Sequence, residues 1–167
     1  LKLDSQSQCP CGSGSPFSNC CQPFIDGAKK PPTAEALMRS RYTAYASGAM
    51  KYLKDTLSPE SRKDYDEAGA KQWASKADWK RLQIVATEKG GEGDTTGTVE
   101  FIATYRIDGK GIDHHEVSTF QKIQDQWYFV EGDSHQHREG EGHHHHHEPI
   151  KPMVRETPKV GRNDDCP

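Results

Sequence analysis

Four of the five cysteines in this 167-residue chain are gathered close to its N-terminus. They stand in the spacing C-x-C-x8-C-C, at Cys9, Cys11, Cys20 and Cys21. Four thiolates can close a tetrahedral shell around zinc, and each neutralises part of the 2+ charge. Gly12 and Gly14 lie between the pairs and can take the positive φ that a metal-binding turn often needs. The spacing therefore predicts a zinc site with four cysteine ligands at the head of the chain.

Disulfides and free thiols are the alternatives to a metal site. The N-terminal residues lack the hydrophobic segment of a signal peptide. We therefore expect a cytoplasmic protein, in which thiols stay reduced. A bridge between the adjacent Cys20 and Cys21 would be strained, and a redox C-x-x-C pair has a different spacing. The segment has no apolar core of its own, so a metal would have to hold it together.

The stretch CPCGSGSPFSNCC resembles the SEC-C motif, the small zinc-binding module named for the C-terminal tail of the SecA translocase ATPase. All four cysteines match the pattern C-x-C-x8-C-[HC]. The resemblance implies zinc as the cofactor and a protein partner for the module. Ser15, Pro16 and Phe17 stand where the family usually carries lysines, which disfavours binding to the ribosome or another acidic surface. Near the other end, GRNDDCP resembles the lead-in to the same motif, so Cys166 would begin a second copy that we expect to continue past Pro167.

Helical patterns dominate the chain between this head and residue 77. Thr33, after two prolines, is a good N-cap for a helix over residues 34–47. Helical spacing continues over 50–57. We expect a further short helix to end near Gly69 and another to cover 70–76.

From residue 78 the hydrophobic period changes from 3.6 to 2. Strands are expected over 78–90, 97–108, 112–123 and 127–133, and the short turns between them make neighbouring strands antiparallel. Helices followed by a strand meander predict an α+β domain. We expect a curved antiparallel sheet of about four long strands packed on the N-terminal helices as a cystatin-like cone.

The chain divides into three parts by composition. Residues 1–30 form the zinc knuckle and its linker, 31–134 the α+β domain, and 135–167 a low-complexity, His-rich tail. The histidine run of the tail is expected to bind metal only adventitiously; it comprises His143, His144, His145, His146 and His147.

The middle of the chain resembles the YchJ family of bacterial proteins, which carry SEC-C motifs around one α+β domain. The stretches that carry the resemblance are ALMRSRYTAYASG, VEFIATYR and HHEVSTFQKIQDQWYFVEGD. The resemblance implies a fold like that of nuclear transport factor two, in which a curved sheet wraps round helices. The family has no well-established biochemical activity, so the resemblance leaves the function open.

Folds of this shape often enclose a cavity between helix and sheet. The candidate lining residues are Arg41, Tyr42, Tyr45, His114, Glu116, Trp127 and Tyr128. His114 and Glu116 lie two apart on one strand, so they share a face and can form an acid–base pair. Alternatively, Glu116 pairs with a buried Arg41 and Trp127 belongs to the core. No nucleophile elbow, P-loop or Rossmann fingerprint is present.

The leading hypothesis is that the protein is a zinc-binding adaptor, rather than an enzyme, and presents SEC-C modules to a protein partner. The alternative is a small-molecule-binding protein or enzyme that uses the cavity of the cone. Nucleic-acid or ribosome binding is disfavoured by a net charge of −3 with 28% charged residues. No stretch is apolar enough to span a membrane. A homodimer through the outer face of the sheet would suit this fold.

Overall fold

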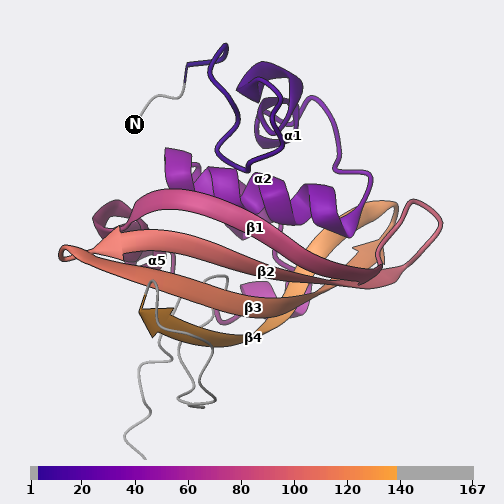
Figure 1. Cartoon of the computed structure of the whole chain (residues 1–167). Helices are drawn as coiled ribbons and strands as arrows, with labels where there is room; N and C mark the ends of the chain where they lie inside the picture. Colours follow the sequence, from indigo (N-terminus) through magenta and orange to yellow (C-terminus); the bar gives the residue numbers. More distant parts are fainter. Residues whose placement is uncertain (1–3, 139–167) are drawn as a thin grey trace, which may run out of the picture.

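The computed structural model describes residues 4–138 of the chain (Figure 1). A short head contains a 3₁₀ turn at Phe17–Asn19 and the helix α1, Gln22–Ile25. The helices that follow are α2 (Ala34–Ser47), α3 (Met50–Asp55), α4 (Pro59–Arg62) and α5 (Glu67–Lys76). The strands are β1 (Asp78–Lys89), β2 (Thr96–Ile107), β3 (Lys110–Ile123) and β4 (Gln126–Arg138).

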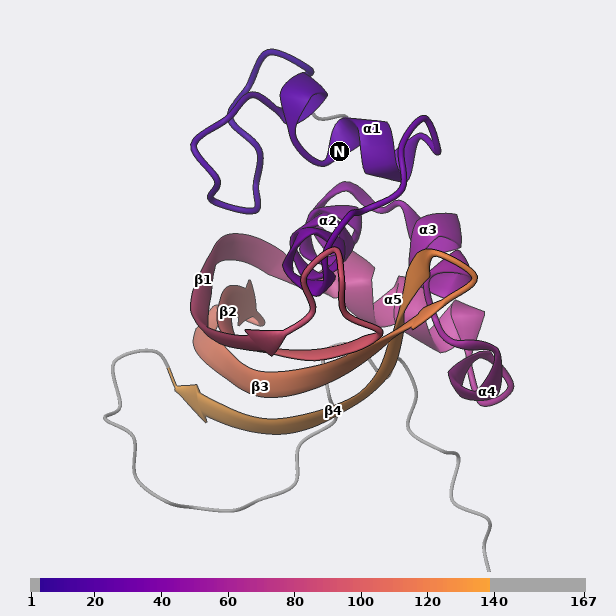
Figure 2. The same ribbon diagram turned by 90° about the vertical axis from the view of Figure 1, so that its right-hand side faces the viewer.

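The four strands form one antiparallel sheet in the order β1-β2-β3-β4. The sheet curves round the helices, so that α2 lies on its concave side (Figure 2). Phe101, Phe120 and Phe129 point inward from β2, β3 and β4 and are fully buried. The α+β class and the curved sheet are therefore confirmed.

The central helix α2 is bounded as the sequence predicts. The hydroxyl of Thr33 accepts a hydrogen bond from the N–H of Ala36 at 3.1 Å, and Gly48 ends the helix with a φ of +77°. The pattern of apolar residues suggests one buried face, yet Ser40 and Thr43 are buried as well. The sheet covers one side of α2 and the head covers the other (Figure 1). Polar residues on the second side are therefore buried too.

The elements differ from the sequence-based expectation at several places. Gly69 lies inside α5 instead of ending a helix, because Asp66 caps α5 by accepting a hydrogen bond from the N–H of Gly69 at 3.1 Å. The helix α1 had no counterpart in the expected elements. The strand β4 continues to Arg138, past the expected boundary at 134, because these residues pair with the start of β3. The predicted His143–His147 run and Cys166 lie outside the described residues.

Within residues 4–138, every helix is too short or too polar to cross a membrane.

Candidate metal centre

The four head cysteines come together in one cluster. Their sulfur atoms all lie within 4.8 Å of one another. The Sγ of Cys20 is 3.5 Å from that of Cys11 and 3.8 Å from that of Cys21. All four are free thiols. The cluster thus offers four soft sulfur ligands around one point, which can hold a metal ion.

Tight turns on both sides of the cluster set these positions. Gly12 and Gly14 take φ values of +79° and +83°, as the sequence predicts. The N–H of Cys9 donates to the carbonyl of Ser15 at 2.9 Å and closes the first loop. On the other side, the 3₁₀ turn ends where the N–H of Cys20 donates to the Phe17 carbonyl at 3.1 Å.

The thiols interact strongly enough to shift each other's acidity. Hydrogen bonds from Cys21 and Cys9 lower the pKa of the Cys11 thiol well below its ordinary value. Hydrogen bonding to Cys11 and Cys9, followed by burial, raises the pKa of Cys21. Burial raises the pKa of Cys20 to about 11. A metal that binds all four as thiolates therefore displaces protons from the cluster, including those of Cys20 and Cys21.

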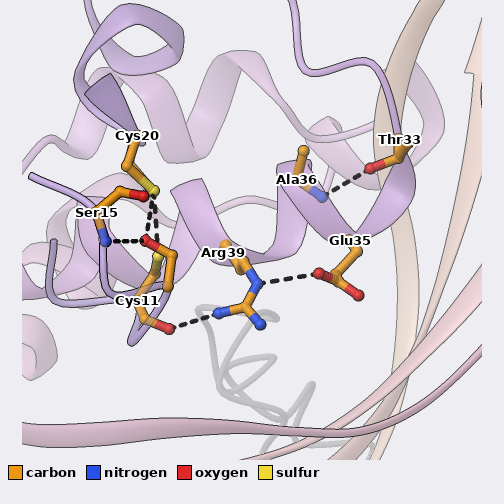
Figure 3. Close-up of polar contacts among 9 residues, drawn as sticks. Cys11, Ser15, Cys20, Thr33, Glu35, Ala36 and Arg39 are labelled. Atoms are coloured by element: carbon orange, nitrogen blue, oxygen red, sulfur yellow. Dashed lines mark hydrogen bonds and ion pairs between the residues drawn. The ribbon is translucent and has the colours of Figure 1, made fainter. Parts of the chain in front are cut away.

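The cluster is packed on the α+β domain. Cys9, Cys11 and Cys21 are buried, and Cys20 is half-buried. The guanidinium of Arg39 on α2 donates to the backbone carbonyl of Cys11 at 2.8 Å (Figure 3). A side chain at Gly12 would come within 3.3 Å of the Leu82 carbonyl on β1.

From the sequence, the head was expected to be an appendage on a Lys- and Pro-rich linker. That prediction did not include these contacts with the α+β domain. A signal was present in α2. Arg39 and Thr43 are polar residues four apart, a spacing that places both on one side of a helix. In the sequence, Arg39 and Thr43 suggest a solvent-exposed helix face, although in the structure they face the head.

The two strand residues proposed as an acid–base pair are indeed in contact. His114 Nε2 lies 3.1 Å from Glu116 Oε1, and neither side chain has any exposed surface. Gln136 Nε2 lies 3.3 Å from His114 Nδ1. The hydroxyl of Ser118 donates to the other oxygen of Glu116. Since Gln136 donates its amide proton to Nδ1, His114 donates from Nε2 to Glu116, and the network is internally consistent.

Arg41 is fully buried, as the sequence predicts, but its described partners are different from the expected one. Its Nη1 donates to the carbonyl of Leu53 at 2.7 Å and to the hydroxyl of Thr56. The guanidinium also lies over the ring of Phe129, 5.2 Å from its centroid. Glu116 is held by His114 and Ser118 instead.

Tyr45 and Trp127, two of the other candidate pocket residues, belong to the core. Tyr45 packs against Trp73 and Trp79, with ring centroids 6.0 and 5.5 Å apart. Trp127 is buried and donates from its indole N–H to the Pro32 carbonyl at 3.2 Å. Tyr128 is only half-buried, because neighbouring strand residues alternate between the two faces.

The pair formed by His114 and Glu116 is closed off from solvent. The side chains of both residues are wholly buried, and the ring centroid of the buried Phe101 lies 6.2 Å from that of His114. A substrate would need access to the pair, and this arrangement gives none. Among the described residues the cysteine cluster is the stronger candidate for function.

Comparison with known proteins shows which proteins this chain is similar to. Residues 33–132 match the family described as "YchJ, middle NTF2-like domain". A UPF0225 protein of Geobacter sulfurreducens is 45% identical over 95% of this chain and 89% of its own length. The solution structure of a SEC-C motif containing protein from Rhodopseudomonas palustris has a TM-score of 0.71 and 38% identity, and covers 76% of this chain and 98% of its own. The crystal structure of a SEC-C motif containing protein from Psychrobacter arcticus has a TM-score of 0.67 and 30% identity, and covers 76% of this chain and 82% of its own.

Proposed function

The chain belongs to the YchJ family of SEC-C motif proteins, and from this premise we propose that it is a zinc-binding adaptor. In this proposal the α+β domain is a rigid support, and the knuckle that it carries binds a protein partner. The observation that carries the proposal is the convergence of four cysteine sulfurs within 4.8 Å.

The geometry of the cluster supports zinc as the metal. Zinc–sulfur bonds of about 2.3 Å at tetrahedral angles place neighbouring sulfurs about 3.8 Å apart. The sulfur of Cys20 lies 3.5 Å from that of Cys11 and 3.8 Å from that of Cys21, close to this tetrahedral sulfur–sulfur distance. Four thiolates with no open position make a closed, structural type of site. When bound, zinc would crosslink the Cys9–Cys11 loop to the Cys20–Cys21 turn.

The exposure of the knuckle supports an interaction role. The cysteines face the domain, whereas Gly12, Ser13, Gly14, Pro16 and Asn19 are exposed. Metal would hold this outer surface in one shape, which lowers the conformational entropy lost when a partner binds. The complete burial of His114 and Glu116 supports the adaptor over the cavity-based alternative.

Elemental analysis tests the metal site directly. Protein purified under reducing conditions, without a nickel column, should contain about one zinc per chain. Cys20→Ser removes one thiolate and should lose most of it, whereas Ser75→Ala on the exposed side of α5 should retain it. Freshly reduced wild-type protein without zinc would refute the proposal.

The adaptor role needs a separate experiment. Pull-downs from bacterial extract with the zinc-loaded protein should capture a partner that is released by a chelator. Cys20→Ser bait should fail to capture the same protein. Capture that is indifferent to the chelator and to Cys20→Ser would refute an interaction through the knuckle.

A further inference from the structure

Two side chains on α2 connect the head to the α+β domain. Arg39 and Thr43 lie one turn apart on the side of the helix that faces the cysteine cluster. Leu37, Arg41 and Tyr45 on the same helix are buried in the core of the α+β domain. One rigid element therefore contacts both the metal ligands and the core.

Thr43 is fully buried, and its hydroxyl lies 3.6 Å from the Sγ of Cys9. A metal-bound thiolate has no proton to give, so the hydroxyl must donate to sulfur. The direction is favourable, because a hydrogen bond to a thiolate stabilises its charge.

Arg39 acts on the backbone of the same loop. Its Nη1 donates to the Cys11 carbonyl at 2.8 Å, and its Nε donates to Glu35 Oε2 at 3.1 Å (Figure 3). Glu35 thus fixes the direction of the guanidinium. Four thiolates around a divalent ion leave a net charge of −2, because four negative charges meet two positive ones. The guanidinium places a positive charge beside that excess.

We propose that Arg39 and Thr43 form the outer shell of the metal site and couple metal binding to the stability of the α+β domain. The inference rests on the proposed zinc site. Outer-shell hydrogen bonds orient metal ligands and tune affinity. Since α2 is also part of the core, a bound metal stabilises the whole domain, and by linkage a destabilised domain holds its metal less tightly.

The test uses full-length, zinc-loaded protein and a chromophoric chelator that competes for zinc. Thr43→Val keeps the volume but removes the donor, and it should lower zinc affinity about 10- to 100-fold. Thr43→Ser restores the hydroxyl and should recover most of that loss. Thr104→Val is the matched control, because Thr104 is another buried threonine whose hydroxyl bonds Asp113 at 2.7 Å, away from the cluster. As long as the variant stays folded it should leave zinc affinity unchanged, because linkage lowers the affinity only when an appreciable fraction of the domain is unfolded.

Arg39→Met provides a second, independent variant if Thr43→Val does not fold. It should also release zinc faster and should reduce the rise in melting temperature that zinc gives. Cobalt-loaded Thr43→Val should shift its thiolate-to-metal absorption, which a purely structural role would not move. Wild-type zinc affinity in both variants would overturn the outer shell while leaving the zinc site intact. Absence of zinc from the wild type would instead overturn the proposed function.

Discussion

At the scale of single residues, the carboxylate of Glu116 is buried inside the cone. Glu116 is 1% exposed, and both its oxygens accept hydrogen bonds, one from His114 and one from Ser118. A buried charge of this kind is costly unless its partners are in place. The sequence predicts that Glu116 points inward, because the alternation on the strand fixes its face. It cannot predict which inward-facing neighbour becomes the partner, because that depends on side-chain packing.

Replacing Glu116 tests whether this network is structural. Glu116→Ala leaves the donors of His114 and Ser118 without their acceptor, at about 1–3 kcal/mol for each stranded group. Glu116→Gln keeps an acceptor oxygen and should cost less. Urea unfolding of the two variants measures both free energies. Wild-type stability in Glu116→Ala would contradict the structural role and would make the pair a functional site that stores strain.

Gly132 on β4 makes the room that Glu116 occupies. A methyl group at this position would lie 2.5 Å from the carboxyl carbon of Glu116. Gly132→Ala should therefore force the carboxylate away from its donors and cost about 1–3 kcal/mol. Gly93→Ala is the matched control, since nothing lies within 4 Å of its added methyl. Equal free energies of unfolding for the two variants would show that the Glu116 carboxylate can move to another position without loss of stability.

At the scale of elements, the sequence predicts those whose signals are local. Thr33 and Gly48 mark both ends of α2, and alternating burial marks most of β2 and β3. The final residues of β4 are missed, because His135 and Gln136 resemble the polar tail that follows. Their strand conformation comes from pairing with His115 and His114 on β3. That pairing is a tertiary contact which leaves no local signal.

Part of the candidate metal site was likewise predictable from local signals, and part was not. The ligand set was predictable, because four cysteines in a fixed spacing carry their own chemistry. The burial of the cluster against α2 was not, because Arg39 and Thr43 are polar and resemble a solvated face. A helix covered on both sides shows a weak amphipathic pattern, which hides its second contact.

Two elements each hold a tyrosine whose ionisation should unfold the domain at high pH. Burial raises the pKa of Tyr52 on α3 and of Tyr105 on β2 to about 12, above the ordinary value of about 10. Their contribution to stability is fully present below pH 10 and is lost as the pH rises towards 12. Free energies of unfolding measured from pH 8 to pH 12 should fall across that window.

Tyr105→Phe is the control for this alkaline loss, because its ring cannot ionise. The variant should show a shallower fall above pH 10 than the wild type. A stability that stays flat up to pH 12 would mean that the folded protein lets both hydroxyls ionise in contact with water.

At the scale of the whole molecule, head and domain share one core. Cys9, Cys11, Phe17 and Cys21 belong to the same buried cluster as the residues of α2 and the sheet. A linker of Lys and Pro suggests two separable parts, yet the packing makes them one. The knuckle thus presents its outer surface from a fixed position, which suits an adaptor better than a tethered module would.

Deletion of residues 1–30 separates these two descriptions. A separable head predicts a domain that melts where the full chain does. The shared core predicts otherwise, because deletion exposes the buried Thr43 and the side of α2 on which the cysteines pack. Each kcal/mol lost should lower the melting temperature by roughly 2–8 °C for a domain of this size. Melting temperatures should fall in the order zinc-loaded chain, chelator-treated chain, truncated chain, since chelation loosens the head and deletion removes it. If the truncated domain had the same melting temperature as the zinc-loaded chain, the contacts of Arg39 and Thr43 would add no stability. The knuckle would then be a tethered module.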